Sequence, residues 1–284
     1  MIESFAKKDG AMPLVSIVVP TYNRGDIIST TIESIIKQTY ICWELLIVDD
    51  GSTDDTEDIV KSFAAVDIRI KYYARPNNRK KGANSCRNYG YEHAKGKFIK
   101  WVDSDDILIP EALFKQIQLI SIDPEYKVCF AYGRFFNDET SELEEGWARK
   151  YTSENLLWDY IRNIIRWPVG GPLWEMSFFE SSPFNEKLKN SQEWLMHGEQ
   201  VIKLKTNNYV ILSEDIYLIR RGNVRMSSSR SSGYYYNSAK ARTSLLLSHL
   251  KSKAVSSSII IELTKQILVF SYHTTKSAVL TITK

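Results

Sequence analysis

The sequence predicts an α/β fold in which a mostly parallel central sheet is flanked by helices. Two observations carry this prediction. Between residues 14 and 106, short apolar runs rich in β-branched residues alternate with segments whose apolar residues recur at helical spacing. Two of the runs stop abruptly at acidic residues, and in parallel sheets the ligand-binding groups lie beyond the carboxyl ends of the strands.

The first four strands and the helices between them can be placed in order. The run LVSIVVP predicts a first strand that ends at Pro20, and apolar residues from Ile27 to Ile36 predict a helix after it. The next strand runs into DDGSTD, where turn formers and a helix N-cap coincide. Strands are expected at residues 14–20, 43–48, 68–74 and 98–102, with helices over 27–39 and 82–94. A further helix, with Ile59, Val60 and Phe63 on its apolar face, is expected between the second and third strands.

The fourth strand ends at three carboxylates within four positions, Asp103, Asp105 and Asp106. Acidic residues are poor strand formers and repel one another unless a positive group lies between them. If the chain stays extended, Asp103 and Asp105 point the same way, as ligands of Mg²⁺ or Mn²⁺ shared with a phosphate. The alternative is a helix cap, supplied by Asp106 or its neighbours.

The second half is less regular. A helix is expected at 112–120, a strand at 128–136, an acidic loop at 137–146 and a helix at 155–167. The pattern then predicts short strands at 174–179, 209–212 and 216–220, with a helix from about 193 to 205 between the first two. Residues 223–233 are rich in Ser and Arg and are expected to be mobile, either as a lid that closes on a ligand or as a solvated linker.

Two helices are expected at the C-terminus, over residues 233–249 and 258–273. The second has an apolar face that includes Ile259, Leu263 and Ile267. Packing against the domain is the simplest role for this face; dimerisation and contact with a membrane surface are the alternatives.

Composition narrows the class of protein. The net charge of +3 over 284 residues is too small to indicate nucleic-acid binding. Arg79, Lys80 and Lys81 form a basic cluster that is either a solvated loop or a contact for a phosphate group. Three scattered cysteines without CxxC spacing indicate a reducing compartment. No run is long enough for a membrane span, so we expect a cytoplasmic protein, soluble or peripheral to the membrane.

Four motifs make the sequence similar to nucleotide-sugar-dependent glycosyltransferases of family 2, which have the GT-A fold. They are VSIVVPTYNR at 15–24, ELLIVDDGSTDDT at 44–56, GANSCRNYGYEHAKGKFIKWVDSDD at 82–106, and FNEKL with QEW between 184 and 194. A dinucleotide-binding fold is the rival, but the turn after the first strand reads PTYNRGD and lacks GxGxxG.

The resemblance implies a role for each residue of the site. Pro20 and Tyr22 would line the nucleotide base and ribose, Asp50 would accept a hydrogen bond from the base ring, and Arg87 would order the nucleotide. Asp103 would face the ribose, and Asp105 would hold Mn²⁺ or Mg²⁺ on the diphosphate.

The resemblance also implies inversion at the anomeric carbon, with a base from an acidic pair before a helix. Here that pair is Gln192-Glu193 rather than Glu-Asp, which makes Glu193 the candidate base, with Glu199 and Asp215 next. The segment NIIRW at 163–167 resembles the QxxRW signature of processive synthases but precedes the base and begins with Asn, so we assign it to packing.

The expected function is therefore transfer of a sugar, most simply from a UDP-sugar, to a hydroxyl of a saccharide or lipid-linked saccharide in glycan synthesis. A sugar nucleotidyltransferase and a non-catalytic nucleotide-sugar-binding module are the alternatives. We expect an N-terminal extension (1–13), a GT-A domain (14–222) and a C-terminal helical region (223–284). The GT-A domain divides into a nucleotide-sugar-binding half (14–106) and an acceptor half (107–222).

Overall fold

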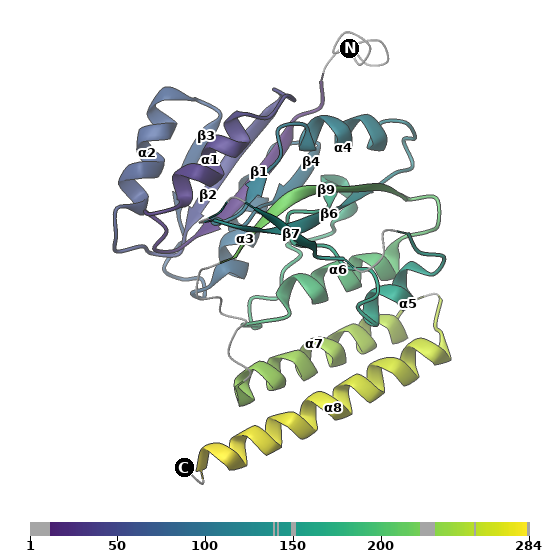
Figure 1. The fold of residues 1–284 in the computed structure, drawn as a ribbon. Coiled ribbons are helices and arrows are strands. Elements are labelled where there is room, and N and C mark those ends of the chain that lie inside the picture. The colour runs from purple at the N-terminus through teal and green to yellow at the C-terminus, as the bar shows by residue number, and fades with distance from the viewer. Residues whose placement is uncertain are drawn as a thin grey trace.

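The computed structural model describes residues 12–138, 140, 142–148, 152–221, 231–252 and 254–282, the last four of these by their backbone alone. It is built on one curled sheet with helices on both faces and a helical hairpin at the C-terminal end (Figure 1). The strand order is β3-β2-β1-β4-β8-β6-β9-β5, with β7 paired to β6. This confirms the predicted fold class.

The first half of the sheet is parallel. The run of β-branched residues forms β1 (Val15–Thr21), which pairs with β2 (Trp43–Asp49) and β4 (Phe98–Trp101), while β3 (Ile70–Ala74) pairs with β2. The connections are α1 (Ile28–Ile36), α2 (Thr56–Val66) and α3 (Ala83–His93).

The register of these strands brings their loops together. Thr21 is opposite Asp49, and Val18 is opposite Trp101. Because the strands are parallel, the loops that follow β1, β2 and β4 leave the same edge of the sheet.

The second half of the sheet is mixed. β8 (Leu173–Glu175) lies antiparallel between β4 and β6 (Val128–Asn137), and β9 (Tyr209–Arg221) runs parallel to β6. β5 (Ile107–Leu108) and β7 (Leu143–Gly146) add short antiparallel edges. The helical elements of this half are α4 (Ala112–Ile120), α5 (Leu156–Ile161), the short 3₁₀ helix η2 (Met176–Phe178) and α6 (Gln192–Lys203).

Side chains alternate between the two faces of the buried strands. In β1, Ile17 and Val19 enter the apolar cluster that includes α1 and α4, whereas Val18 enters the cluster under α5 and α6. Leu45 and Leu46 divide in the same way in β2. Both faces are covered, which explains why these strands appear in the sequence as continuous apolar runs.

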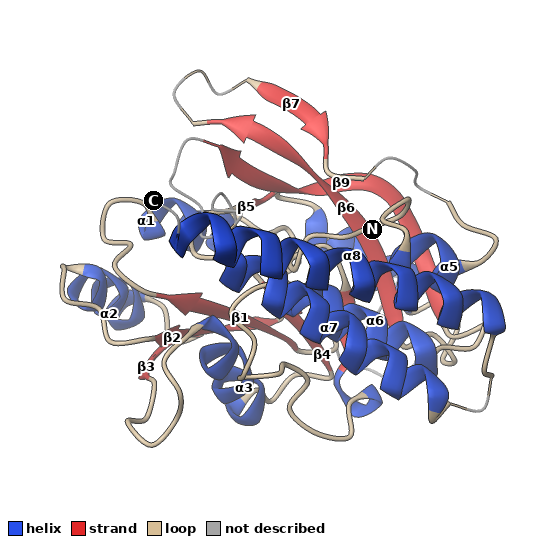
Figure 2. Ribbon diagram, turned by 90° about the horizontal axis from the view of Figure 1, so that it is seen from below, coloured by secondary structure: helices blue, strands red, loops and turns tan. Residues whose placement is uncertain are grey.

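The chain ends in a helical hairpin, α7 (Ser232–Leu250) and α8 (Ser257–Ile282). α7 packs on α6 and α8 packs on α7, so that α8 is the outermost helix at this end in both ribbon views (Figures 1 and 2). Within the described part of the chain, no helix is long and apolar enough to cross a membrane.

Several local predictions are corrected. The expected helix over 155–167 ends at Ile161, because Asn163 takes a left-handed conformation (φ 56°). The strands expected at 209–212 and 216–220 form one strand with irregular register opposite Tyr132, which accommodates the polar residues between them. β5, and β7 within the expected acidic loop, were not predicted. Of the expected mobile segment, residues 223–230 lie outside the described residues, and Gly233 belongs to α7.

Candidate active site

The loops after β1 and β2 are joined to each other. The backbone N–H of Asn23 donates to Ser52 Oγ at 2.9 Å, and Asn23 Oδ1 accepts from the N–H of Thr53 at 2.8 Å. Asn23 has a φ of 49°, which Asn tolerates better than most residues. This turn leaves Tyr22 exposed at the sheet edge beside Pro20, with Lys81 Nζ 4.0 Å from the centre of its ring.

The two acids at the end of β2 have different surroundings. Asp49 Oδ1 accepts from the N–H of Gly51 and from the N–H and Oγ of Ser52, while Oδ2 accepts from the Tyr72 hydroxyl at 3.0 Å. Asp49 therefore stabilises the turn. These contacts hold Asp49 within the turn, and Asp50 takes no part in them.

Asp50 is itself held by a cation that sequence reasoning missed. Its Oδ1 accepts from Arg75 Nε and from the N–H of Gly82, the latter at 3.0 Å. Both side chains of the ion pair are nine-tenths buried. Asp50 thus also links β2 to the loop that leads into α3.

The acidic loop after β4 forms a turn, with the N–H of Asp106 donating to the carbonyl of Asp103 at 3.2 Å. The chain is not extended here, so the expectation that Asp103 and Asp105 point the same way along a strand does not apply. Asp103 Oδ1 accepts from Arg87 Nη2 at 2.7 Å, whereas an Asp105 oxygen lies 3.6 Å from Arg24 Nη2. The two carboxylates therefore have separate cationic partners.

Asp106 has an internal role. It is buried, and its Oδ1 accepts from the N–H of Arg220 at 3.0 Å. Burial raises its pKa well above the usual range, and the charges of Asp103 and Asp105 raise it further. It does not cap α4, since Glu111 occupies the N-cap position of that helix. The cap alternative is thus wrong for Asp106, which anchors the loop to β9.

Arg87 connects the acidic loop to α6. This buried side chain donates through Nη2 to Asp103 and through Nη1 to Asn84 Oδ1 and Gln192 Oε1, both at 3.2 Å. Gln192 is the first residue of α6 and Glu193 the second. One guanidinium therefore holds Asp103 and the first residue of α6 in fixed relation.

Glu193 is a half-buried acid in the first turn of α6. Burial raises the pKa of its carboxyl. The charge of Asp103 raises this pKa further, whereas the charge of Arg87 lowers it. A carboxylate with a raised pKa is a better proton acceptor near neutral pH. The other candidates lie elsewhere: Glu199 Oε1 accepts from Ser248 Oγ on α7 at 3.3 Å, and Asp215 is ion-paired with Arg134 at 3.0 Å.

The start of α6 is fixed by α7. Ser191, just before the helix, has a left-handed backbone (φ 56°, ψ 29°). Its Oγ lies 3.3 Å from Ser238 Oγ and accepts from Arg242 Nη1 at 3.3 Å. The Arg242 guanidinium also lies over the Trp194 ring, 3.9 Å from its centre. No local pattern in the sequence indicates this support, because Arg242 is 51 residues away along the chain.

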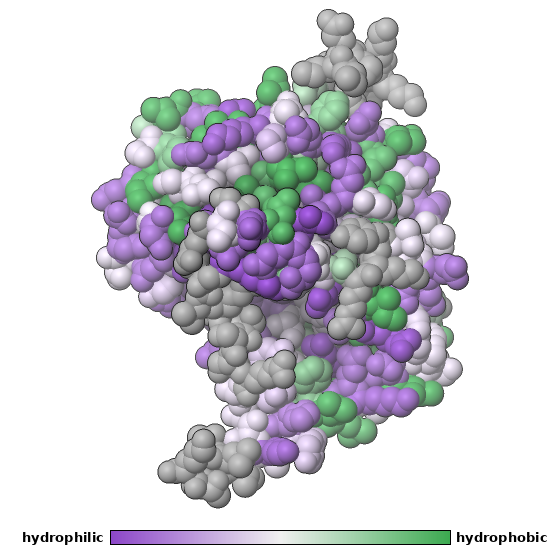
Figure 3. Space-filling model, in the orientation of Figure 1, coloured by the Kyte–Doolittle hydropathy of each residue, from purple (hydrophilic) through white to green (hydrophobic). Residues whose placement is uncertain are grey.

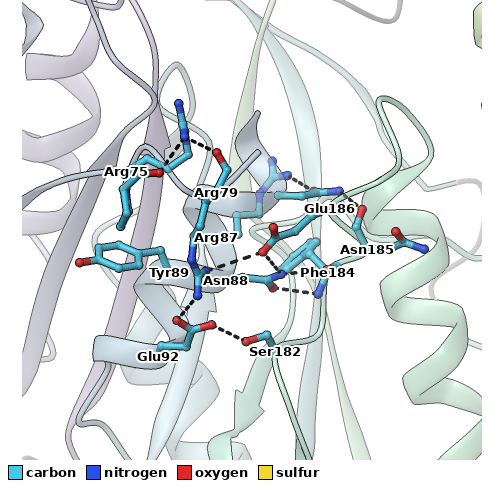
Figure 4. Close-up of polar contacts among 12 residues, drawn as sticks. Arg75, Arg79, Arg87, Asn88, Tyr89, Glu92, Ser182, Phe184, Asn185 and Glu186 are labelled. Carbon is cyan, nitrogen blue, oxygen red and sulfur yellow. Dashed lines mark hydrogen bonds and ion pairs between the residues drawn. The ribbon is translucent and has the colours of Figure 1, made fainter. Parts of the chain in front are cut away.

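A second set of contacts ties α3 to the segment before α6 (Figure 4). Asn88 Nδ2 donates to the carbonyl of Phe184 at 2.8 Å, and the N–H of Phe184 donates back to Asn88 Oδ1 at 3.0 Å. Arg79 is ion-paired with Glu92, which also accepts from Ser182 Oγ at 2.9 Å. Arg79 is therefore a structural cation, and of the basic cluster Lys81 is the residue that lies at Tyr22.

The acidic loop is suited to a divalent cation shared with a diphosphate. Asp103 and Asp105 have side chains that are 38% and 25% exposed, whereas Asp106 is buried. Among the described residues no three His, Cys, Asp or Glu side chains form a metal-binding group. Mg²⁺ typically needs one or two carboxylates plus substrate phosphates, so the oxygen donors of this loop fit such an ion.

A cavity of about 1100 Å³ lies away from this edge, between α6, the 177–183 segment and the end of α7. Lys127, Lys203 and Lys251 are among its lining residues, and none of the predicted site residues is. The candidate site is instead at the edge of the sheet, where the loops after the parallel strands contact α3 and the start of α6. The predicted site residues carried by these elements are Pro20, Tyr22, Asp50, Arg87, Asp103, Asp105 and Glu193.

Residues 16–184 match the family described as Glycosyl transferase family 2. The UDP-Glc:alpha-D-GlcNAc-diphosphoundecaprenol beta-1,3-glucosyltransferase WfgD of Escherichia coli is 43% identical over 122 residues, 43% of this chain and 46% of that protein. The GalNAc(5)-diNAcBac-PP-undecaprenol beta-1,3-glucosyltransferase of Campylobacter jejuni is 29% identical over 190 residues, 65% of this chain and 59% of that protein. The chain thus spans about half the length of these curated relatives.

Solved structures show the same fold. S. aureus TarS in complex with UDP-GlcNAc superposes with a TM-score of 0.68 at 20% identity, over 92% of this chain and 74% of that one. The mannosyltransferase PcManGT from Pyrobaculum calidifontis, in complex with GDP-Man and Mn²⁺, gives 0.60 at 13% identity over 99% of this chain and 80% of that one. With the family match covering more than half of its length, the chain belongs to glycosyl transferase family 2 and has the GT-A fold.

Proposed function

We propose that this glycosyltransferase moves a sugar from a UDP-sugar to a hydroxyl acceptor with inversion at the anomeric carbon. The observation that carries the proposal is the Arg87 bridge, which joins Asp103 on the donor side to the first turn of α6, where Glu193 lies. Donor and base residues thus share one edge of the sheet. Binding a nucleotide sugar alone would not require Glu193.

The donor end is assigned to the loops after β1, β2 and β4. Tyr22 and Pro20 line the uracil and ribose, Asp50 accepts from the uracil ring N–H, and Asp103 faces the ribose. Asp50 is held by Arg75 and Gly82, so its carboxylate is positioned before the nucleotide arrives.

A divalent cation, Mn²⁺ or Mg²⁺, would be held by Asp105 and would neutralise charge developing on the diphosphate. Arg24, whose guanidinium lies 3.6 Å from Asp105, places a further positive charge at this end of the site. The two acids Asp103 and Asp105 keep separate partners, which reduces their mutual repulsion in the resting enzyme.

The acceptor end is assigned to α6. Glu193 takes the proton of the acceptor hydroxyl as its oxygen attacks the anomeric carbon from the face opposite the diphosphate. The bond between that carbon and the diphosphate oxygen breaks, and its electron pair leaves with UDP. The raised pKa of Glu193 suits it to this proton transfer.

We assign the acceptor to the saccharides and lipid-linked saccharides of glycan synthesis. Two relatives are named for transfer to diphosphoundecaprenol- or PP-undecaprenol-linked sugars, which supports a lipid-linked acceptor for this chain. Such an acceptor would place the enzyme in the cytoplasm at the membrane surface.

Glu193→Gln tests the proposal. The amide keeps the shape of the side chain but cannot take a proton, so turnover should fall by about 10²-fold or more while UDP affinity stays unchanged. Glu199→Gln, on the same helix, is the matched control and should retain turnover. Near wild-type turnover of Glu193→Gln with the true acceptor would exclude Glu193 as the base.

A screen of nucleotide sugars for metal-dependent thermal stabilisation of the protein identifies the donor. Nucleotide binding without any sugar transfer or donor hydrolysis would favour the non-catalytic alternative.

A further inference from the structure

The outer face of α8 carries apolar side chains that nothing in the described chain covers. Ile261, Leu268 and Tyr272 are 54%, 65% and 62% exposed, and with Lys265 and Lys276 they recur every three or four residues. That spacing places them on one face of the helix. The hairpin forms the lower edge of the molecule in Figure 3, where apolar and polar side chains lie side by side.

The opposite face of α8 accounts for its attachment to the protein. Ile259 and Leu263 are buried, and Gln266 Nε2 donates to the carbonyl of Ile161 at 2.8 Å. The His273 ring stacks on Tyr235 of α7, with 5.0 Å between ring centres. Since packing uses this inner face, the outer apolar face needs a separate explanation.

Charge is unevenly distributed along the chain. Residues 231–284 contain seven of the 37 Lys and Arg and one of the 34 Asp and Glu, a net charge of +6, which leaves residues 1–230 at −3. The one acid, Glu262, accepts from Gln266 on its own helix. Residues 231–284 are therefore a basic segment of an otherwise slightly acidic chain. Arg242 in this segment is buried, whereas Lys265 and Lys276 are exposed on α8.

We propose that the α7–α8 hairpin is a docking surface for an anionic lipid membrane. Ile261, Leu268, Val269 and Tyr272 would enter the headgroup region, and the lysines beside them would pair with lipid phosphates, as in helices that lie in the membrane interface. A second copy of the chain is disfavoured as the occupant, because a two-fold contact through this face would bring Lys265 and Lys276 of both copies together.

The hairpin also connects this surface to the candidate active site. Asn190 Nδ2 donates to the carbonyl of Tyr234 at 3.2 Å, and Arg242 donates to Ser191, both immediately before α6. Docking through α8 would thus hold the base helix at a fixed height above the lipid. This deepens the proposed lipid-linked acceptor, but vesicle binding itself needs neither donor nor acceptor.

Vesicle flotation of the full chain tests the docking surface. Binding should be stronger to phosphatidylcholine vesicles that contain phosphatidylglycerol than to phosphatidylcholine alone, and should weaken as salt is raised. Leu268→Gln should lower the partition coefficient by about tenfold. Ile122→Gln, equally exposed at 65% on a loop distant in sequence, is the matched control and should bind like wild type.

Charge is tested in the same way. Lys265→Glu should lower the partition coefficient by about fivefold or more, whereas Lys97→Glu, also an exposed lysine, should leave it near wild type. Equal binding to both vesicle types, or equal losses of binding in a variant and its control, would overturn the proposal.

A dimer in light scattering that Leu268→Gln dissociates would assign the face to a second copy of the chain. Thermal melting confirms that each variant is folded, and hydrolysis of the donor in solution reports the proposed activity separately.

Discussion

Lys100 makes the stability of the protein depend on pH in a way that can be calculated. It lies in β4, three residues before Asp103, and is fully buried. Its Nζ donates to Gln116 Oε1 at 2.9 Å and to the carbonyl of Gly171 at 3.1 Å, with no carboxylate as a partner in these bonds. Burial lowers the pKa of this ammonium from 10.5 to about 7.

The sign follows from the protons that each state binds. Between about pH 7 and 10.5 the unfolded chain keeps a proton on Lys100 and the folded protein does not, so stability rises as pH rises. From pH 7.5 to 8.5 the two pKa values give a gain of about 1.2 kcal/mol, close to the limit of about 1.4 kcal/mol per pH unit. Burial raises the pKa of the Cys86 and Cys129 thiols to about 12. Above about pH 9 these thiols lower the stability as pH rises, because the unfolded chain loses their protons and the folded protein keeps them.

Urea unfolding at pH 7.5 and 8.5 measures this gain. Lys100→Met removes the titrating group, so its free energy of unfolding should change with pH by about 1.2 kcal/mol less than that of wild type. Lys97→Met, an exposed lysine of the same region, should follow wild type. If the free energies of unfolding of Lys100→Met and wild type change equally between pH 7.5 and 8.5, the buried ammonium does not lose its proton near pH 7. That result would refute the predicted pH dependence.

Three further substitutions probe the site. Asp105→Asn should lower activity by orders of magnitude with little loss of folding, and calorimetry should show UDP binding without metal dependence. Asp50→Ala should weaken UDP binding by about 1 to 3 kcal/mol in calorimetry, and urea unfolding should show a loss of stability of about 3 kcal/mol because Arg75 is left buried without its partner. Arg87→Lys cannot hold Asp103 and Gln192 together, so kcat should fall by about tenfold or more with a smaller change in donor KM, as steady-state kinetics would show.

The parallel half of the fold was predictable because both faces of its strands are buried. Runs such as residues 14–20 and 43–48 have few alternatives to a central strand, and the acids after β2 and β4 mark the carboxyl edge. The sequence likewise placed the site residues at this edge. Their roles stay predictions that the experiments above decide.

The features that could not be predicted depend on contacts between distant residues. The pairing of Asp50 with Arg75, and of Asp106 with the backbone of Arg220, has no local pattern. β5 is two residues long and exists only because β9 returns to pair with it. Such elements are set by tertiary contacts rather than by propensity or periodicity.

The left-handed backbone of Ser191 restricts which residues this position can accept. Gly would relieve the strain but lose the hydroxyl that Arg242 and Ser238 hold, while Asn or Asp would tolerate the conformation and keep a polar group. Val or Ile would be strongly disfavoured and would reorient the first turn of α6, with Glu193 on it. Sequence drift at this partly exposed position is therefore confined to a few residue types, for a reason that lies in backbone geometry and not in any contact with substrate.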